Sequence, residues 1–205
     1  ILSKQNSLSA QDGLACSGWL LNNAFYKFLR NCLLFVANRI KEIINYLNKQ
    51  YLPDIIIVAC NTASTCINKG EFKNTHTIKV EGKLPTLATP LTKQNTTGNI
   101  IADKSLAEMV EHHITNPNKM KQIVKRHVNK LQLNKLKTLV LGCTHYELVF
   151  AYFKEFCKET DIINNSEDLI NNLNFNPNNT KTNILLLQSK KDQNFYNKMW
   201  QILKS

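Results

Sequence analysis

Two short stretches of the chain share one pattern, and this pattern limits the folds that the chain can adopt. The first runs from Ile55 to Ser64 and the second from Thr138 to Tyr146. Each begins with apolar residues, reaches a small residue and then a cysteine, and continues with small polar residues. A short apolar run indicates a strand buried on both faces, and polar residues behind it are typical of a helix N-cap. The pattern therefore predicts two strand–turn–helix units.

The cysteines of these units, Cys60 and Cys143, come at the ends of the predicted strands. Open parallel sheets bind ligands beyond the carboxyl ends of their strands. At a helix N-terminus, the helix dipole and free N–H groups also stabilise a thiolate. A single free cysteine is more often a small buried apolar residue, but the matched context of this pair favours catalysis. We expect the remaining cysteines to be small apolar residues without a catalytic role, namely Cys16, Cys32, Cys66 and Cys157.

The two stretches together resemble a known family. Ala59–Ser64 and Leu141–Tyr146 are similar, in this order, to the two signatures of the aspartate/glutamate racemases, and of glutamate racemase in particular. The resemblance implies two α/β lobes that face each other, with the end of the chain returning to the first lobe. The similarity also covers residues 36–54, 87–91, 106–111 and 161–173.

The resemblance implies a cofactor-independent racemase that interconverts L- and D-glutamate. One thiolate removes the α-proton while a thiol on the opposite side returns one, so neither pyridoxal phosphate nor a metal is required. Cys60 and Cys143 would be this acid/base pair, and His145 would protonate or position the Cys143 side. The remaining predicted site residues are the donors to the substrate carboxylates, namely Asn61, Thr62 and Thr144.

Two alternatives to a glutamate racemase stay open. One is a racemase for aspartate or another acidic amino acid, and the other is a catalytically impaired remnant that acts as a binding module. The chain has no good match to the early Asp-Ser-Gly turn of the family, nor to its Gly-Thr-rich substrate loop. We therefore expect a truncated or divergent member with an incomplete first lobe. An active enzyme would supply D-glutamate for peptidoglycan and cell shape, and a homodimer is a candidate assembly.

The net charge and the cysteine content indicate which binding partners and which cellular compartment to expect. The net charge is +11, but 23 of the 26 basic residues are lysine, and they are scattered along the chain. Because arginine is the usual reader of bases and phosphates, we expect solvated faces and no nucleic-acid partner. Polar residues interrupt the apolar segment 19–37, so we expect no membrane partner. Six cysteines without a CxxC pair or a zinc spacing are typical of free thiols in the cytoplasm.

Strands that alternate with helices predict an α/β fold with parallel sheets. The expected first lobe comprises residues 1–83 and 160–205 and carries Cys60, whereas residues 84–159 form a second lobe with Cys143. The predicted strands are 55–60, 77–80, 84–91, 138–143, 161–163 and 183–188. The predicted helices are 19–49, 61–69, 106–113, 118–133, 147–158, one that begins at Ser166, and 193–203.

Overall fold

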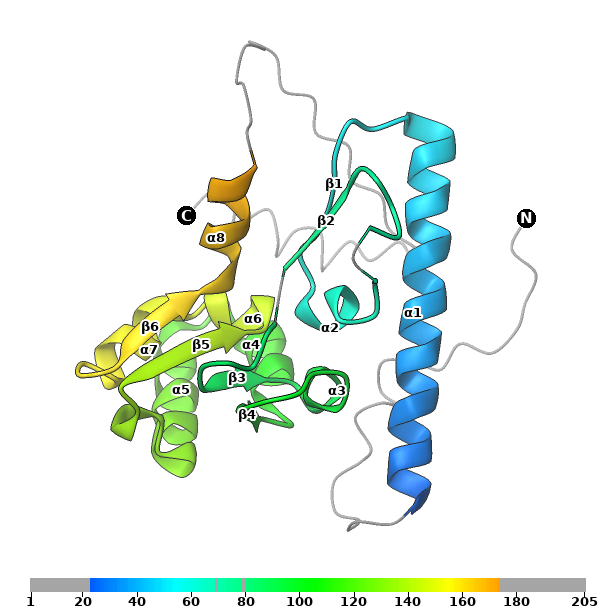
Figure 1. Ribbon diagram of the computed structural model, residues 1–205. Helices are drawn as coiled ribbons and strands as arrows, with labels where there is room; N and C mark the ends of the chain where they lie inside the picture. The colour runs from blue at the N-terminus through cyan, green and yellow to red at the C-terminus, as the bar shows by residue number, and fades with distance from the viewer. Residues whose placement is uncertain (1–22, 69, 79, 174–205) are drawn as a thin grey trace.

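The structure, a computed structural model, describes residues 23–68, 70–78 and 80–173. Within these residues the fold is α/β, with one parallel sheet of two strands and one of four (Figure 1). The predicted fold class is confirmed. The predicted strand 183–188 and helix 193–203 lie outside the described residues.

The first lobe consists of a long helix beside a small sheet. The elements are α1 (Asn23–Tyr51), β1 (Ile56–Val58), α2 (Asn61–Ser64) and β2 (Thr75–Thr77). β1 pairs with β2 in parallel, and α1 stands upright next to them in Figure 1. The short strand expected at residues 77–80 lies slightly earlier in the chain, at β2.

The helix expected over residues 61–69 ends after a single turn. The Ser64 hydroxyl donates to the Val58 carbonyl at 2.9 Å, and the Thr65 hydroxyl donates to the Thr62 carbonyl at 2.7 Å. Hydroxyl groups that bond to nearby backbone compete with a continuing helix. They therefore hold α2 to a short turn at the end of β1.

The second lobe is built on the four-stranded sheet, whose strand order is β4-β3-β5-β6. Every pairing in it is parallel. The sequence analysis missed β4, because three residues between a turn and an aspartate give no clear periodicity. The strands are β3 (Thr86–Ala88), β4 (Ile100–Ala102), β5 (Thr138–Gly142) and β6 (Asp161–Asn164).

Helices surround this sheet, and Figure 1 shows α4, α5 and α7 grouped along it. The predicted helices 106–113 and 118–133 are present as α4 and α5. The helix predicted over residues 147–158 is present in shorter form as α7, and a separate one-turn helix, α6, precedes it. The helices are α3 (Pro90–Gln94), α4 (Leu106–His113), α5 (Pro117–Leu131), α6 (Thr144–Glu147), α7 (Phe150–Phe156) and α8 (Asn165–Asn172).

The lobe boundary differs from the one expected at residue 160. β6 pairs with β5, and Ile162 stands opposite Leu139. Apolar residues on β6 thus extend the second sheet, and Ile162 is buried in its core. Residues 161–164 therefore belong to the second lobe, while 174–205 lie outside the described residues.

The main hydrophobic core lies in the second lobe. Its buried residues come from β3, β5, β6 and the helices around them. Among the described helices, none combines the length and apolar composition needed to cross a membrane. The largest fully buried members of the core include Leu87, Leu106, Met120, Leu139, Leu141, Tyr146 and Phe153.

A buried, hydrogen-bonded pair of polar side chains lies beside this core. Asp103 Oδ2 is 2.6 Å from His127 Nδ1, and both side chains are almost completely buried. Burial alone raises the pKa of Asp103. Hydrogen bonds from His127 and from the N–H groups of Ser105 and Leu106 outweigh that effect and hold the pKa at about 2.

This lowered pKa predicts a loss of stability in acid. A carboxyl group whose pKa is lower in the folded state stabilises the fold above its unfolded pKa, near 3.8. That contribution disappears as the pH falls toward 2. In urea unfolding, the stability difference between the wild type and Asp103→Asn should shrink by about 2 kcal/mol between pH 5 and pH 2. A difference that stays constant over this range would contradict the assignment.

Candidate active site

Cys60 and Cys143 occupy equivalent positions in the two lobes. Cys60 follows β1 and is the N-cap of α2, and Cys143 follows β5 and is the N-cap of α6. Both therefore lie at the carboxyl ends of parallel strands, where the sequence analysis placed them. Cys60 is exposed, whereas Cys143 is buried.

The position of Cys143 depends on the glycine before it. A Cβ atom on Gly142 would stand 2.6 Å from Thr86 Cγ2 and 3.1 Å from the Leu87 carbonyl oxygen. Contacts under 3.0 Å essentially never occur for a real Cβ atom. Only glycine lets the end of β5 lie this close to β3, and this approach brings Cys143 to the edge of the sheet where β3 ends.

The electrostatic surroundings of Cys143 favour the thiol form. Burial raises its pKa to about 11, although the peptide N–H groups of His145 and Tyr146 act in the opposite direction. Negative charge on Cys60 or Glu147 raises it further. The expected stabilisation of a thiolate by a helix dipole is therefore outweighed at this position, because α6 is a single turn and the thiol is buried.

A short chain of polar groups leads away from Cys143. His145 Nδ1 lies 3.8 Å from Cys143 Sγ, and His145 Nε2 lies 3.8 Å from Glu111 Oε2. The second distance is within ion-pair range but too long for a hydrogen bond. An imidazolium at His145 would be stabilised by Glu111 and would in turn stabilise a thiolate at Cys143.

Glu111 was not among the site residues predicted from the sequence. It lies on α4, far from Cys143 in the sequence, and α4 packs against α6 in the fold. The one feature of the sequence that could have pointed to Glu111 is the resemblance to the racemases, which covers residues 106–111. The helical pattern of α4 says nothing about which neighbour its polar side chains contact.

Three threonine hydroxyls join the two lobes beside Cys60. Thr62 Oγ1 lies 3.1 Å from Thr89 Oγ1 and 2.8 Å from Thr92 Oγ1, and the last two are 3.1 Å apart. Thr89 is the N-cap of α3, whose first residue is Pro90. The sequence analysis predicted Thr62 as a site residue but missed the other two.

Asn61 is the clearest unsatisfied polar group of the site. Its side chain is 2% exposed, and within the described residues neither Oδ1 nor Nδ2 has a hydrogen-bond partner. A buried carboxamide without partners is costly, so this position favours a polar ligand. Thr144, the other predicted binding residue, is half-buried and directly follows Cys143.

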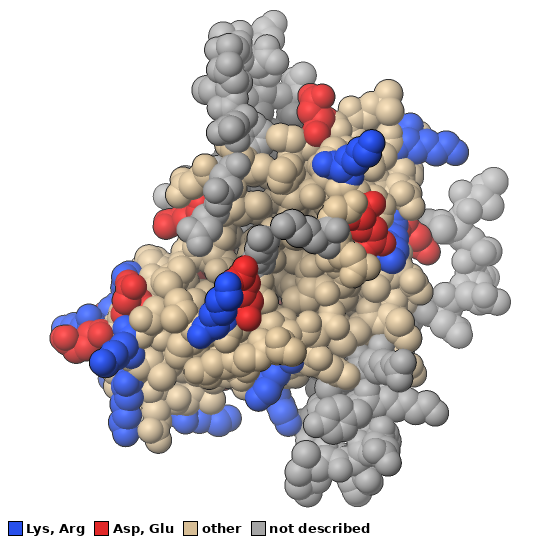
Figure 2. Space-filling view, viewed as in Figure 1, with Lys and Arg blue, Asp and Glu red and all other residues tan. Residues whose placement is uncertain are grey.

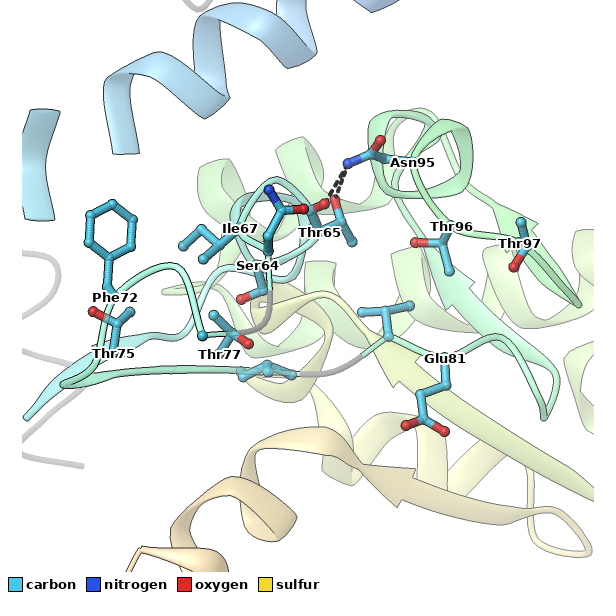
Figure 3. A pocket seen from close by; sticks show the side chains of 14 residues that line it. Ser64, Thr65, Ile67, Phe72, Thr75, Thr77, Glu81, Asn95, Thr96 and Thr97 are labelled. Atoms are coloured by element: carbon cyan, nitrogen blue, oxygen red, sulfur yellow. Dashed lines mark hydrogen bonds between the residues drawn. The ribbon is translucent and has the colours of Figure 1, made fainter. Parts of the chain in front are cut away.

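A cavity of about 490 Å³ adjoins the end of α2 (Figure 3). Asn95, at the end of α3, donates its amide to the Thr65 carbonyl oxygen at 2.6 Å and lies 3.2 Å from the Thr65 hydroxyl. Neither cysteine lines this cavity. The amide of Asn95 is thus a second link between α2 and the second lobe, beside the threonine hydroxyls.

Among the described residues, no three histidine, cysteine, aspartate or glutamate side chains are grouped to hold a metal ion. On the face shown in Figure 2, basic side chains are scattered and several lie next to acidic ones. The candidate site therefore consists of thiol, imidazole, hydroxyl, carboxamide and carboxylate groups.

Comparison with known proteins places these features in a family context. No protein-family model matches the chain. A glutamate racemase of Buchnera aphidicola is 26% identical over an alignment that covers 82% of this chain and 78% of that protein. One from Aliarcobacter butzleri is also 26% identical, with coverage of 69% and 66%.

Solved structures of glutamate racemases share the fold. The Campylobacter jejuni structure has a TM-score of 0.61 at 19% identity and covers 82% of this chain and 80% of its own. The RacE1 isoform of Bacillus anthracis has a TM-score of 0.55 at 24% identity, and this chain spans 62% of its length.

The chain is thus similar in sequence to glutamate racemases and shares the fold of their solved structures.

The contact between Glu111 and His145 predicts a specific change in thiol reactivity. Glu111→Gln removes the carboxylate that lies 3.8 Å from His145 Nε2, so a positively charged His145, and through it a thiolate at Cys143, would be less stabilised. Alkylation of Cys143 by iodoacetamide at pH 7.5, followed by peptide mass spectrometry, should slow about threefold to tenfold, because one pKa unit is tenfold in thiolate population.

A matched control is available on the same helix. Glu108 lies 3.8 Å from His112 in an exposed pair on α4, away from Cys143. Glu108→Gln should leave the alkylation rate of Cys143 within twofold of the wild type. Equal rates for the wild type and Glu111→Gln would exclude a role for Glu111 at this thiol.

Proposed function

We propose that the protein is a cofactor-independent glutamate racemase that uses Cys60 and Cys143 as its acid/base pair. The observation that carries the proposal is the placement of two thiols at equivalent strand ends in the two lobes. Racemisation needs a proton acceptor on one face of Cα and a donor on the other, which a single group cannot easily provide.

The reaction begins with a proton transfer to sulfur. A thiolate takes the α-proton of glutamate, and the electron pair of the broken C–H bond stays on Cα as a carbanion. The thiol on the opposite face then gives its proton to Cα, so one thiol and one thiolate have exchanged roles. The raised pKa of Cys143 favours its resting role as the proton donor, with Cys60 as the base.

His145 and Glu111 would support the Cys143 side. In the reverse direction Cys143 must act as a thiolate, which its burial disfavours. An imidazolium at His145 next to its sulfur offsets this cost, and Glu111 stabilises that imidazolium. This arrangement supplies general acid/base assistance where it is most needed.

Substrate binding would use the polar groups at the ends of the strands. The carboxamide of Asn61 is buried without a hydrogen-bond partner among the described residues, and the hydroxyl of Thr62 lies next to two others at the lobe junction. Donors of this kind suit the carboxylates of an acidic amino acid, and Thr144 would add another beside Cys143. A substrate carboxylate would replace the hydrogen bonds that the hydroxyls now make to one another.

The choice of glutamate over aspartate rests on the relatives. Curated relatives are named glutamate racemase. Structures of the Escherichia coli and Francisella tularensis enzymes are described as complexes with L-glutamate and D-glutamate. By the same reasoning we propose a role in supplying D-glutamate for peptidoglycan in the cytoplasm, with a homodimer as a candidate assembly.

One observation favours a non-catalytic alternative. In the described residues, the first lobe has a sheet of only two strands, and the cysteine that it contributes is exposed. A binding module that retains part of the substrate site would still be stabilised by glutamate against thermal unfolding, but it would not turn over.

Solvent exchange at Cα tests the proposal directly. In deuterated buffer without pyridoxal phosphate, the protein should replace the α-hydrogen of L- and D-glutamate with deuterium, observed by NMR. Cys60→Ala and Cys143→Ala should each reduce racemisation at least about a hundredfold, since general acid/base groups contribute roughly that much. A parallel panel with aspartate decides the substrate.

Cys66→Ala is the matched control, because that thiol lies 3.4 Å from the Thr62 carbonyl oxygen but has no assigned role. It should retain activity within a few-fold. Undiminished turnover in both Cys60→Ala and Cys143→Ala would rule out the two-thiol mechanism. Absence of exchange with every acidic amino acid would favour the binding module.

A further inference from the structure

The buried pair of Asp103 and His127 lies outside the candidate site but is connected to it through α4. Asp103 follows β4 directly, and its N–H donates to the Ala88 carbonyl oxygen at 2.9 Å. Asp103 and His127 are 5% and 4% exposed. One carboxylate thereby connects the edge of the second sheet to α5, which carries His127.

The other carboxylate oxygen of Asp103 holds the start of α4. Asp103 Oδ1 accepts hydrogen bonds from the N–H groups of Ser105 at 2.8 Å and Leu106 at 2.7 Å. Ser105 is the N-cap of α4 by position but makes no side-chain capping bond of its own. Asp103 therefore satisfies N–H groups that the first turn of a helix leaves unpaired.

α4 is also the helix that presents Glu111 to His145. It packs against both α5 and α6, and the carboxylate of Glu111 lies 3.8 Å from His145 Nε2. A displacement of α4 too small to disturb the packing of the core would still change the distance between Glu111 and His145. Geometric errors near a reacting group are costly, and about 1 Å can reduce the rate a hundredfold.

We propose that Asp103 and His127 are positioning residues that fix α4, and so hold Glu111 against His145 beside Cys143. The effect of this pair on catalysis rests on the proposed function. Its effect on the reactivity of the Cys143 thiol does not. A buried ionic pair adds little net stability over apolar residues of similar size, because desolvation offsets the attraction. Holding α4 in a fixed position is therefore the better explanation for the presence of this buried pair.

A double-mutant cycle tests the connection. Alkylation of Cys143 is measured for the wild type, Asp103→Asn, Glu111→Gln and the double variant, with urea unfolding in parallel. Asp103→Asn keeps an oxygen for the N–H groups of Ser105 and Leu106 but loses the charge that faces His127. It should slow alkylation about threefold to tenfold, like Glu111→Gln, and the double variant should be no slower than either single variant.

His127 offers a second pair of variants if Asp103→Asn does not fold. His127→Asn retains an amide donor near the position of Nδ1 and should keep the alkylation rate within twofold. His127→Leu removes the donor at similar volume and should slow alkylation as Glu111→Gln does. His112→Gln, on the exposed side of α4, is the control and should have no effect.

The outcomes separate positioning from plain stabilisation. Loss of stability in Asp103→Asn or His127→Leu with an unchanged alkylation rate would overturn the proposal, and so would additive effects of Asp103→Asn and Glu111→Gln. If the protein racemises glutamate, Asp103→Asn should lower kcat while KM stays within twofold. A coupled effect on alkylation in a protein without racemase activity would refute the proposed function alone.

Discussion

The hydrogen bonds between Thr62 and the hydroxyls of Thr89 and Thr92 decide how the two lobes meet. Thr62 lies on α2, whose N-cap is Cys60. The other two hydroxyls lie in the first turn of α3, which follows β3. Each bond contributes only about 0.5–1.5 kcal/mol. The junction is thus strong enough to orient α2 and weak enough for a substrate carboxylate to replace it.

The two lobes contribute unequally to the stability of this arrangement. Among the described residues, nearly all of the largest fully buried side chains belong to the second lobe, and Ile44 of α1 is the exception. On α1, large apolar side chains such as Phe35 and Tyr46 are exposed. The second lobe is therefore the rigid base that fixes Cys143, His145 and the hydroxyls at the lobe junction, and α2 is positioned against it.

The sequence predicted the parts of the fold that depend on local pattern. Buried apolar runs identified the strands before both cysteines, and helical periodicity identified α4 and α5. β4 was missed because three residues are too few for a pattern, and β6 was placed in the wrong lobe because strand pairing is not local. For the same reason, the contacts of Glu111, Thr89 and Thr92 were not found. The periodicity of a sequence does not indicate which side chains from different elements will be in contact. The prediction that the two cysteines form one site therefore relied on their matched motifs.

The most direct test of the account is the distance between the two sulfur atoms in a crystal structure with bound glutamate. Contacts of about 3–3.5 Å from each sulfur to the reacting centre place Cys60 and Cys143 roughly 6–9 Å apart on opposite faces of Cα. We predict that separation, with Asn61 in contact with the ligand. Sulfur atoms more than about 12 Å apart with glutamate bound, too far for both to reach one carbon, would contradict it.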